Sequence, residues 1–317
     1  MRDKSNATER GTVTVGLVLG ALGVLAFSMT MPATRVAVQQ LDPWFVAFGR
    51  AVGAALLAGG YLWLTRARRP TRAQWRRLPV VALGVVVGFP LFTSLALTTQ
   101  TAAHGAVVVA VLPAMTAIFA VLRAGERPSL LFWVASAGGL LAVLAFLMTS
   151  GTVRGALTVA DLFLLAAVVL CGLGYAEGGA LARDLGGAAT ICWALLVALP
   201  ATLPITLVAA AIHPPRADAA GWAAFGYVTG ISMFLGFFAW YAGLARGGIA
   251  RVGQLQLTQP VLTLAWSALL LGELVTPASI ASALVVLGFV VLTQRAREGT
   301  RFFRARVDAR ATRSSLE

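Results

Sequence analysis

Residues 106–129, AVVVAVLPAMTAIFAVLRAGERPS, are similar in pattern to residues 253–276, GQLQLTQPVLTLAWSALLLGELVT. The two stretches align without a gap at an offset of 147 residues, which pairs Pro113 with Pro260. Weak internal similarity at one fixed offset indicates two copies of one structural unit. The chain is therefore expected to fold as a duplicated structure.

The composition places this duplicated structure in a membrane. Of the 317 residues, 59% are hydrophobic and only 12% are charged, whereas a soluble domain is about half apolar and about a quarter charged. Cys171 and Cys192 both lie inside apolar runs, so they form neither a disulfide framework nor a metal-ligand cluster. A soluble enzyme, a nucleic-acid module and a disordered regulator are thereby disfavoured, and an all-α integral membrane protein is predicted.

A helix needs about 20 mostly apolar residues to cross about 30 Å of hydrocarbon. The sequence predicts ten such spans, at residues 13–31, 43–64, 78–98, 103–122, 130–149, 158–178, 188–210, 221–243, 248–271 and 277–294. We expect a first five-helix repeat over residues 11–150, a second over residues 155–295, and a basic tail over residues 296–317. Because five is an odd number, the second repeat enters the membrane inverted relative to the first.

The basic residues predict the orientation of the chain. Of the 25 Lys and Arg residues, only Arg35, Arg154 and Arg216 fall in predicted outer loops, and Arg50 lies within the second span. Since cytoplasmic loops carry the excess of Lys and Arg, both termini are expected in the cytoplasm. The net charge of +13 is then explained by contact with anionic membrane lipids, not with nucleic acid.

Two inverted copies of one fold can exchange conformations and open a shared central site to each side of the membrane in turn. The predicted architecture therefore favours a transporter. This inference depends on the duplication and not on any single residue.

Several segments resemble the drug/metabolite transporter superfamily, in its ten-helix EamA-type branch. They are the proline–glutamate pair at the same spacing in each half, the Asp42-Pro43…Arg50 run, Leu95-Ala96-Leu97 at the end of the third span, and Asp161 at the start of the second half. The similarity extends from about Gly16 to Thr293.

The resemblance implies a carrier that exports small metabolites, often amino acids, without ATP. Within the branch it favours exporters of aromatic and other neutral amino acids. The sequence departs from the family pattern around Cys171-Gly172-Leu173-Gly174-Tyr175, where a tryptophan is usual. This departure leaves the type of substrate open.

The duplicated residues at the ends and centres of the spans have predicted structural roles. Glu126 and Glu273 end the fourth and ninth spans, and we interpret them as caps of the next helix or acceptors across the short turn. They are not a proton-coupling pair, because carboxylates on opposite membrane faces, about 30 Å apart, cannot share a proton. Pro113 and Pro260 lie near the centres of their spans and are interpreted as hinges, with a static bend as the alternative.

The ninth span carries the best candidate for a substrate-binding face. Gln256, Gln259 and Thr263 are spaced i, i+3, i+7 and share a helix face with Pro260. Polar side chains in hydrocarbon need internal partners, so this face is expected to line a wet cavity, with interhelical contact as the alternative. Thr93 and Ser94 form a second candidate patch, although such hydroxyls often bond to their own helix.

Aromatic and charged residues complete the list of candidates. Tyr175 and Trp240 lie towards the inner ends of spans that the resemblance implies line the cavity; they either stack on a substrate or belong to an inner-face aromatic belt. Glu177 either meets a substrate ammonium or is solvated at the inner mouth. Arg50 is either a carboxylate anchor or gate, or an arginine held by a carbonyl or by Asp42.

No phosphate-binding loop, nucleophile motif or paired-histidine metal motif is present in the sequence. We therefore expect no enzyme activity, no metal and no cofactor, and flux that follows the substrate gradient or exchange. His104, at the outer face, is interpreted as an interfacial residue rather than a proton relay. Small-residue pairs such as Gly16/Gly20 are interpreted as internal packing surfaces of a monomer.

The sequence thus predicts a secondary transporter of the cytoplasmic (inner) membrane that exports small amino-acid-like metabolites by alternating access. An importer or exchanger of another metabolite, such as a sugar or nucleotide derivative, is the alternative. A non-transporting membrane scaffold is the third possibility.

Overall fold

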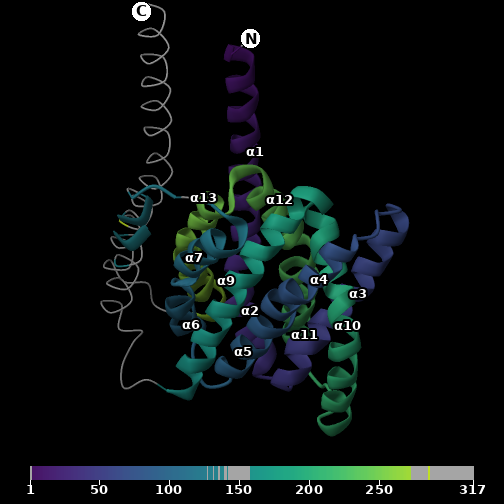
Figure 1. The fold of residues 1–317 in the computed structure, drawn as a ribbon. Helices are drawn as coiled ribbons and strands as arrows, with labels where there is room; N and C mark the ends of the chain where they lie inside the picture. The colour runs from purple at the N-terminus through teal and green to yellow at the C-terminus, as the bar shows by residue number, and fades with distance from the viewer. Residues whose placement is uncertain are drawn as a thin grey trace, which may run out of the picture.

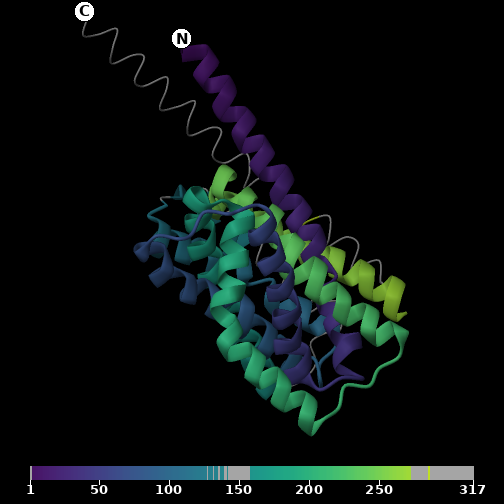
Figure 2. The same ribbon diagram turned by 90° about the vertical axis from the view of Figure 1, so that its right-hand side faces the viewer.

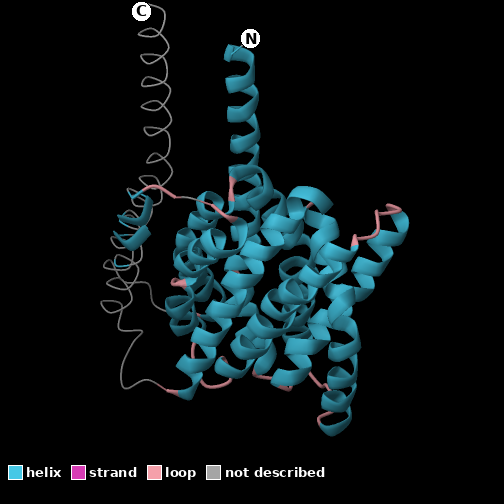
Figure 3. Ribbon diagram, viewed as in Figure 1, coloured by secondary structure: helices cyan, strands magenta, loops and turns pink. Residues whose placement is uncertain are grey.

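The computed structural model describes residues 2–126 and 158–272, with scattered residues between 128 and 141 and residue 285. Every element in this part of the chain is helical (Figure 3). The helices form one bundle, and the N-terminal helix α1 extends beyond it at one end (Figures 1 and 2). The prediction of an all-α fold is therefore confirmed for the residues that the structure describes.

Six long helical segments carry the apolar character that the composition predicts. Each is long and apolar enough to cross a membrane, and they are Gly11–Val38, Pro43–Leu64, Arg72–Ala96, Val159–Leu185, Gly187–Ile212 and Ala219–Gly247. They coincide with the predicted first, second, third, sixth, seventh and eighth spans. The chain is a multi-pass integral membrane protein.

The first span consists of two helices, α1 (Arg2–Ser28) and α2 (Thr30–Val38), with Met29 between them. The sequence predicted that this span ends at Pro32, and that prediction is wrong. Pro32 lies in the first turn of α2, where backbone N–H groups have no intrahelical partner and proline is tolerated. The second span is the single helix α3 (Pro43–Leu64).

The third and eighth spans both contain a π-helical segment. In the third span, α4 (Arg72–Val81) continues through η1 (Ala82–Gly88) into α5 (Phe89–Ala96). In the eighth span, α11 (Ala219–Gly226) continues through η2 (Tyr227–Leu235) into α12 (Gly236–Gly247). A π-helical insertion weakens the regular hydrogen-bond ladder, and it does so at equivalent places in the two halves.

The fourth and ninth spans are interrupted. The fourth consists of α6 (Ala102–Val109) and α7 (Leu112–Ala124), and the ninth of α13 (Ile249–Gly253), the 3₁₀ helix η3 (Gln254–Thr258) and α14 (Gln259–Leu271). Pro113 and Pro260 were predicted near the centres of regular helices, but each lies in the first turn of α7 or α14. Because proline has no N–H to donate, it starts a helix more easily than it continues one.

The two interrupted spans also end in the same way, at backbone positions that are 147 residues apart. Both α7 and α14 end at a glycine in the left-handed conformation, Gly125 with φ 65° and Gly272 with φ 70°. Only glycine adopts this conformation without a steric cost. The repeated sequence therefore folds into the same helix with the same start and stop.

The helices α9 (Val159–Leu185) and α10 (Gly187–Ile212) begin the second half of the chain, and α9 packs against α7, α5, α12 and α10. Small residues bring α1 against α12: a methyl group at Gly16 would lie 2.5 Å from the Gly247 backbone nitrogen, and one at Gly243 would lie 2.7 Å from that of Gly20. These predicted small-residue pairs therefore form packing surfaces inside the chain.

Several predictions lie outside the described residues. They are the fifth and tenth spans at residues 130–149 and 277–294 for the most part, the cap Glu273 and the basic tail 296–317. The count of ten helices and the orientation of the termini remain predictions.

Candidate functional site

A small cavity lies in the middle of the bundle, between segments of both halves of the chain. Its lining comes from ten elements, and its residues are Phe27, Thr30, Arg50, Val85, Phe89, Leu112, Cys171, Tyr175, Ser232, Met233, Phe237 and Gln259. The volume of about 20 Å³ is room for one water molecule, whereas ligand pockets commonly measure about 300–1,000 Å³. The cavity in this structure is therefore too small to hold a metabolite.

Arg50 is the charged residue of this cavity. It lies on α3, is 1% exposed, and its Nε and Nη2 atoms have no hydrogen-bond partner. The predicted attachment to Asp42 is wrong: one Asp42 carboxylate oxygen caps α3 by accepting from the Trp44 and Phe45 N–H groups, and the other lies 3.5 Å from His213 Nδ1. Arg50 is therefore a buried guanidinium that lines the cavity and has no anionic partner among the described residues.

The three residues of the predicted binding face separate in the structure. Gln259 lines the cavity, and its Oε1 atom has no partner. Gln256 is buried beside the Tyr175 hydroxyl and does not line the cavity. Thr263 donates instead to the Ser28 carbonyl at 2.8 Å, so it takes the interhelical role that was its alternative interpretation.

An aromatic cluster forms one wall of the site. Tyr175 lines the cavity and packs against Phe27, with ring centroids 6.2 Å apart, and against Trp240 at 5.2 Å. Trp240 is fully buried, and its indole N–H has no partner. Neither residue belongs to an inner-face belt, since belt residues lie at the water interface.

The predicted patch at Thr93 and Ser94 lies on α5, four and five residues beyond the cavity residue Phe89. Thr93 Oγ1 donates to the Phe89 carbonyl at 2.6 Å, so its hydroxyl is used within its own helix. Ser94 is buried, and its Oγ atom has no partner. Neither side chain lines the cavity.

Glu177 lies in the C-terminal half of α9 and is 1% exposed. One carboxylate oxygen pairs with Arg77 of α4, and the other accepts from Arg123 Nε of α7 at 3.0 Å. It is thus not solvated at the inner mouth, so that alternative is wrong, and the contact with a substrate ammonium stays a prediction. The sequence could not indicate these pairs, because Arg77 and Arg123 lie in segments far from Glu177 along the chain.

Glu126 caps a helix, as predicted, but not the next helix in the chain. Its two carboxylate oxygens accept from the Ile249 and Ala250 N–H groups, each at 2.8 Å, and Arg183 Nη2 donates to it at 2.8 Å. These N–H groups are the first of α13, which is part of the ninth span. The carboxylate therefore joins the end of α7 to the interrupted span of the other half.

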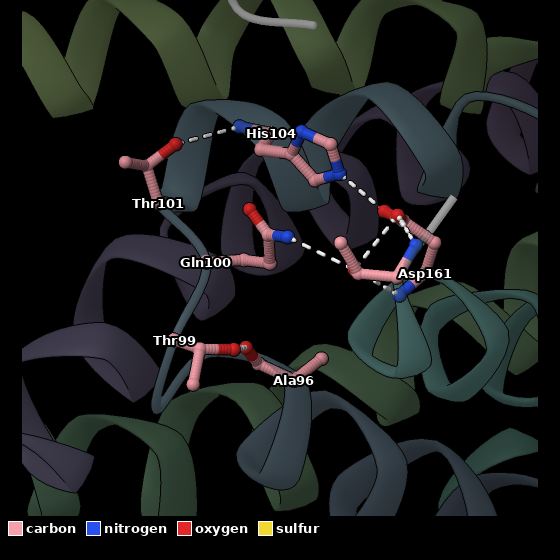
Figure 4. A network of polar contacts seen from close by, with 7 residues as sticks. Ala96, Thr99, Gln100, Thr101, His104 and Asp161 are labelled. Carbon is pink, nitrogen blue, oxygen red and sulfur yellow. Dashed lines mark hydrogen bonds and ion pairs between the residues drawn. The ribbon is translucent and has the colours of Figure 1, made fainter. Parts of the chain in front are cut away.

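The N-terminal end of α9 carries a second buried carboxylate, shown in Figure 4. Asp161 Oδ1 lies 2.5 Å from His104 Nε2 of α6, and Asp161 Oδ2 accepts from the Thr158 N–H at 2.7 Å. Gln100 Nε2 adds a bond of 3.2 Å to Thr158 Oγ1. His104 is thus paired with an acid of the second half, a contact that sequence reasoning missed.

A bundle of membrane-crossing helices that encloses a small cavity, with a few buried polar groups from both halves of the chain, is consistent with a membrane transporter. The model of the EamA-like transporter family matches the chain twice, at residues 14–148 and 158–294. The chain belongs to this family, of the drug/metabolite transporter superfamily, and is a transporter of small molecules rather than an enzyme.

One relative supports this assignment, and one solved structure shares the fold. The uncharacterized transporter YdeK of Bacillus subtilis (strain 168) is 45% identical over 285 residues, which are 89% of this chain and 98% of YdeK. A solved crystal structure has the same fold at 18% identity, with a TM-score of 0.71, and the match covers 88% of this chain and 97% of the other.

Proposed function

We propose that this transporter exports small amino-acid-like metabolites across the cytoplasmic membrane by alternating access, without ATP. In this proposal residues 11–150 and 155–295 are inverted repeats, both termini lie in the cytoplasm, and the protein acts as a monomer. The observation that supports it most is the central cavity, where Arg50 and Gln259 present buried polar atoms without partners. Such atoms are costly in a membrane unless a ligand satisfies them.

The small volume of the cavity is consistent with alternating access. A site of about 20 Å³ has to expand before it admits an amino acid, and the backbone next to it is irregular. The segments η1 and η2 and the starts of α7 and α14 each contribute a residue to the cavity wall or adjoin one that does. Irregular helical segments are places where a helix bends at low cost, so the predicted hinges Pro113 and Pro260 are well placed for this motion.

The buried acids support facilitated flux or exchange rather than obligate proton coupling. Asp161 and Glu177 are the buried acidic residues in the described part of the chain, and both are held by basic side chains from the first half of the chain. A proton relay needs an acid that faces the substrate pathway. The alternative proposal, an importer or exchanger of a sugar or nucleotide derivative, is less favoured, because the cavity wall is largely apolar and aromatic.

Counterflow in proteoliposomes tests the proposal. Vesicles loaded with unlabelled leucine or phenylalanine are expected to accumulate the same labelled amino acid, and Gln259→Leu is expected to lower this rate at least fivefold. Gln39→Leu is the matched control, because Gln39 is an exposed glutamine outside the cavity. Counterflow of a sugar but of no amino acid would select the alternative, and equal rates in wild type and Gln259→Leu would remove Gln259 from the site.

A further inference from the structure

The guanidinium of Arg50 is the least satisfied charged group of the described chain. The residue ranks among the largest fully buried side chains, and its Nε and Nη2 atoms are without partners. An arginine remains protonated at any physiological pH, and an unpaired charge inside a membrane costs several kcal/mol. A purely structural residue at this position would be less costly if it were apolar.

The protein supplies no acid to Arg50 within the described residues. No acidic side chain lines the cavity. Asp42 caps α3 and faces His213, Asp161 is paired with His104, and Glu177 is paired with Arg77 and Arg123. Because the described residues offer Arg50 no counter-charge, an anionic ligand is the partner that this cavity suits.

We propose that Arg50 binds the carboxylate of the transported molecule, and that the substrates are organic carboxylates with an apolar or aromatic body. This inference rests on the proposed function, because it assigns a substrate class to the same central cavity. A guanidinium presents two parallel N–H donors to a carboxylate, which gives both binding energy and orientation.

The remainder of the cavity fits the rest of such a molecule. Phe27, Tyr175 and Phe237 offer aromatic surface for an apolar body. On the polar side, Thr30 and Ser232 already share a hydrogen bond of 2.8 Å, and Gln259 Oε1 is an uncharged acceptor. An ammonium group therefore meets only a neutral acceptor and aromatic faces, so it is optional, whereas the carboxylate is required.

A series of matched ligands tests this requirement on the purified full-length transporter in detergent. Phenylalanine and phenylpyruvate both carry the carboxylate, and only phenylalanine carries the ammonium. Phenylalaninamide and phenethylamine lack the carboxylate. We expect the first two to raise the Tm, because a ligand that binds only the folded state stabilises it by mass action, and we expect the last two to leave it unchanged.

Variants of Arg50 separate a binding role from a structural one. Arg50→Met is expected to have a Tm above that of the wild type without ligand, because it removes an unpaired buried charge, and to lose the Tm shift with phenylalanine and phenylpyruvate. Arg50→Lys keeps the charge without the paired donors and is expected to bind at least tenfold more weakly. Arg35→Met is the matched control: Arg35 Nη1 donates to the Leu97 and Thr98 carbonyls, so its loss lowers the Tm and keeps the ligand shift.

The outcomes distinguish this inference from the proposed function. A shift by phenylpyruvate but not by phenylalanine keeps the role of Arg50 and removes the amino-acid assignment. Shifts by phenylalanine that Arg50→Met retains, or equal shifts by phenylalaninamide, overturn the role of Arg50 and keep amino-acid transport. An Arg50→Met protein that is less stable than wild type and still binds both carboxylates assigns Arg50 to the framework and overturns the inference. A series in which no carboxylate ligand shifts the Tm overturns both proposals.

Discussion

Buried polar groups on and around α9 differ in whether they have partners within the protein. Asp161, in the first turn of α9, and Glu177, two residues beyond Tyr175, are each held by basic side chains from the first half of the chain. At the central cavity, which α9 lines with Cys171 and Tyr175, Arg50 and Gln259 have polar atoms with no partner. All four side chains are almost completely buried, so the contrast is one of pairing and not of burial.

This contrast distinguishes residues that hold the helices together from residues that are candidates for binding the substrate. A buried charge that has its partners fixes one arrangement of helices, whereas a buried charge without partners raises the free energy until something binds it. The paired groups connect α9 of the second half to α4, α6 and α7 of the first half. The unpaired groups of Arg50 and Gln259 line the cavity itself. Substitutions that break the ion pairs should therefore affect stability, and substitutions of the unpaired cavity residues should affect ligand binding.

The largest expected loss of stability comes from stripping Glu177 of its partners. In Arg77→Met/Arg123→Met the carboxylate stays buried without a counter-charge, and we expect the free energy of unfolding to fall by about 3 kcal/mol. This is the lower end of the usual range, because the side chains of Arg77 and Arg123 are 35% and 45% exposed. The Tm in detergent measures the loss.

The matched control adds Glu177→Gln to the same pair of substitutions. A neutral amide needs no counter-charge, so the triple variant should regain most of the lost Tm. If the triple variant is no more stable than the double variant, then the arginines stabilise through packing and the pairing of Glu177 is not what holds the helices.

The next effect concerns the contact between Glu126 and the start of α13. Glu126→Gln keeps one acceptor and loses the charge that strengthens two backbone hydrogen bonds, so we expect a loss of about 1–2 kcal/mol. Arg183→Gln removes the ion pair of the same carboxylate and should cost less than about 0.5 kcal/mol, because that arginine is largely solvated. Equal losses in the two variants, measured as Tm, would show that the ion pair and not the helix cap carries the stability.

Much of the fold could be predicted from the sequence because membrane insertion leaves a strong local signal. Long apolar segments such as Pro43–Leu64 were located by length and hydrophobicity alone. The duplication was visible because Pro113 and Gly125 recur with the same spacing as Pro260 and Gly272. The sequence did not show that Pro113 and Pro260 each lie in the first turn of a new helix. The interruption of the helix before each proline is seen only in the folded structure.

The candidate site was less predictable, because its properties depend on contacts between distant segments. The sequence indicated that Gln259 faces inward, but it could not separate Gln259 from Thr263, whose hydroxyl meets Ser28 at the other end of the chain. It also identified Arg50 as unusual without showing whether a partner exists. The pairing of Glu177 was not predictable for the same reason, because its arginines are 100 and 54 residues away in sequence.

The smallest effects are expected at Thr93 and Ser94, which are neighbours with opposite hydrogen bonding. Thr93→Val removes a hydroxyl that bonds to its own helix, so we expect a change in stability of about 0.5 kcal/mol or less and unchanged counterflow. Ser94→Ala removes a buried hydroxyl without a partner, so we expect a gain of about 0.5–1 kcal/mol. Both changes are read as Tm in detergent. A loss of stability in Ser94→Ala would show that the Ser94 hydroxyl has a hydrogen-bond partner in the membrane-embedded protein. Buried polar atoms without a partner in the structure could then no longer be used to identify binding residues.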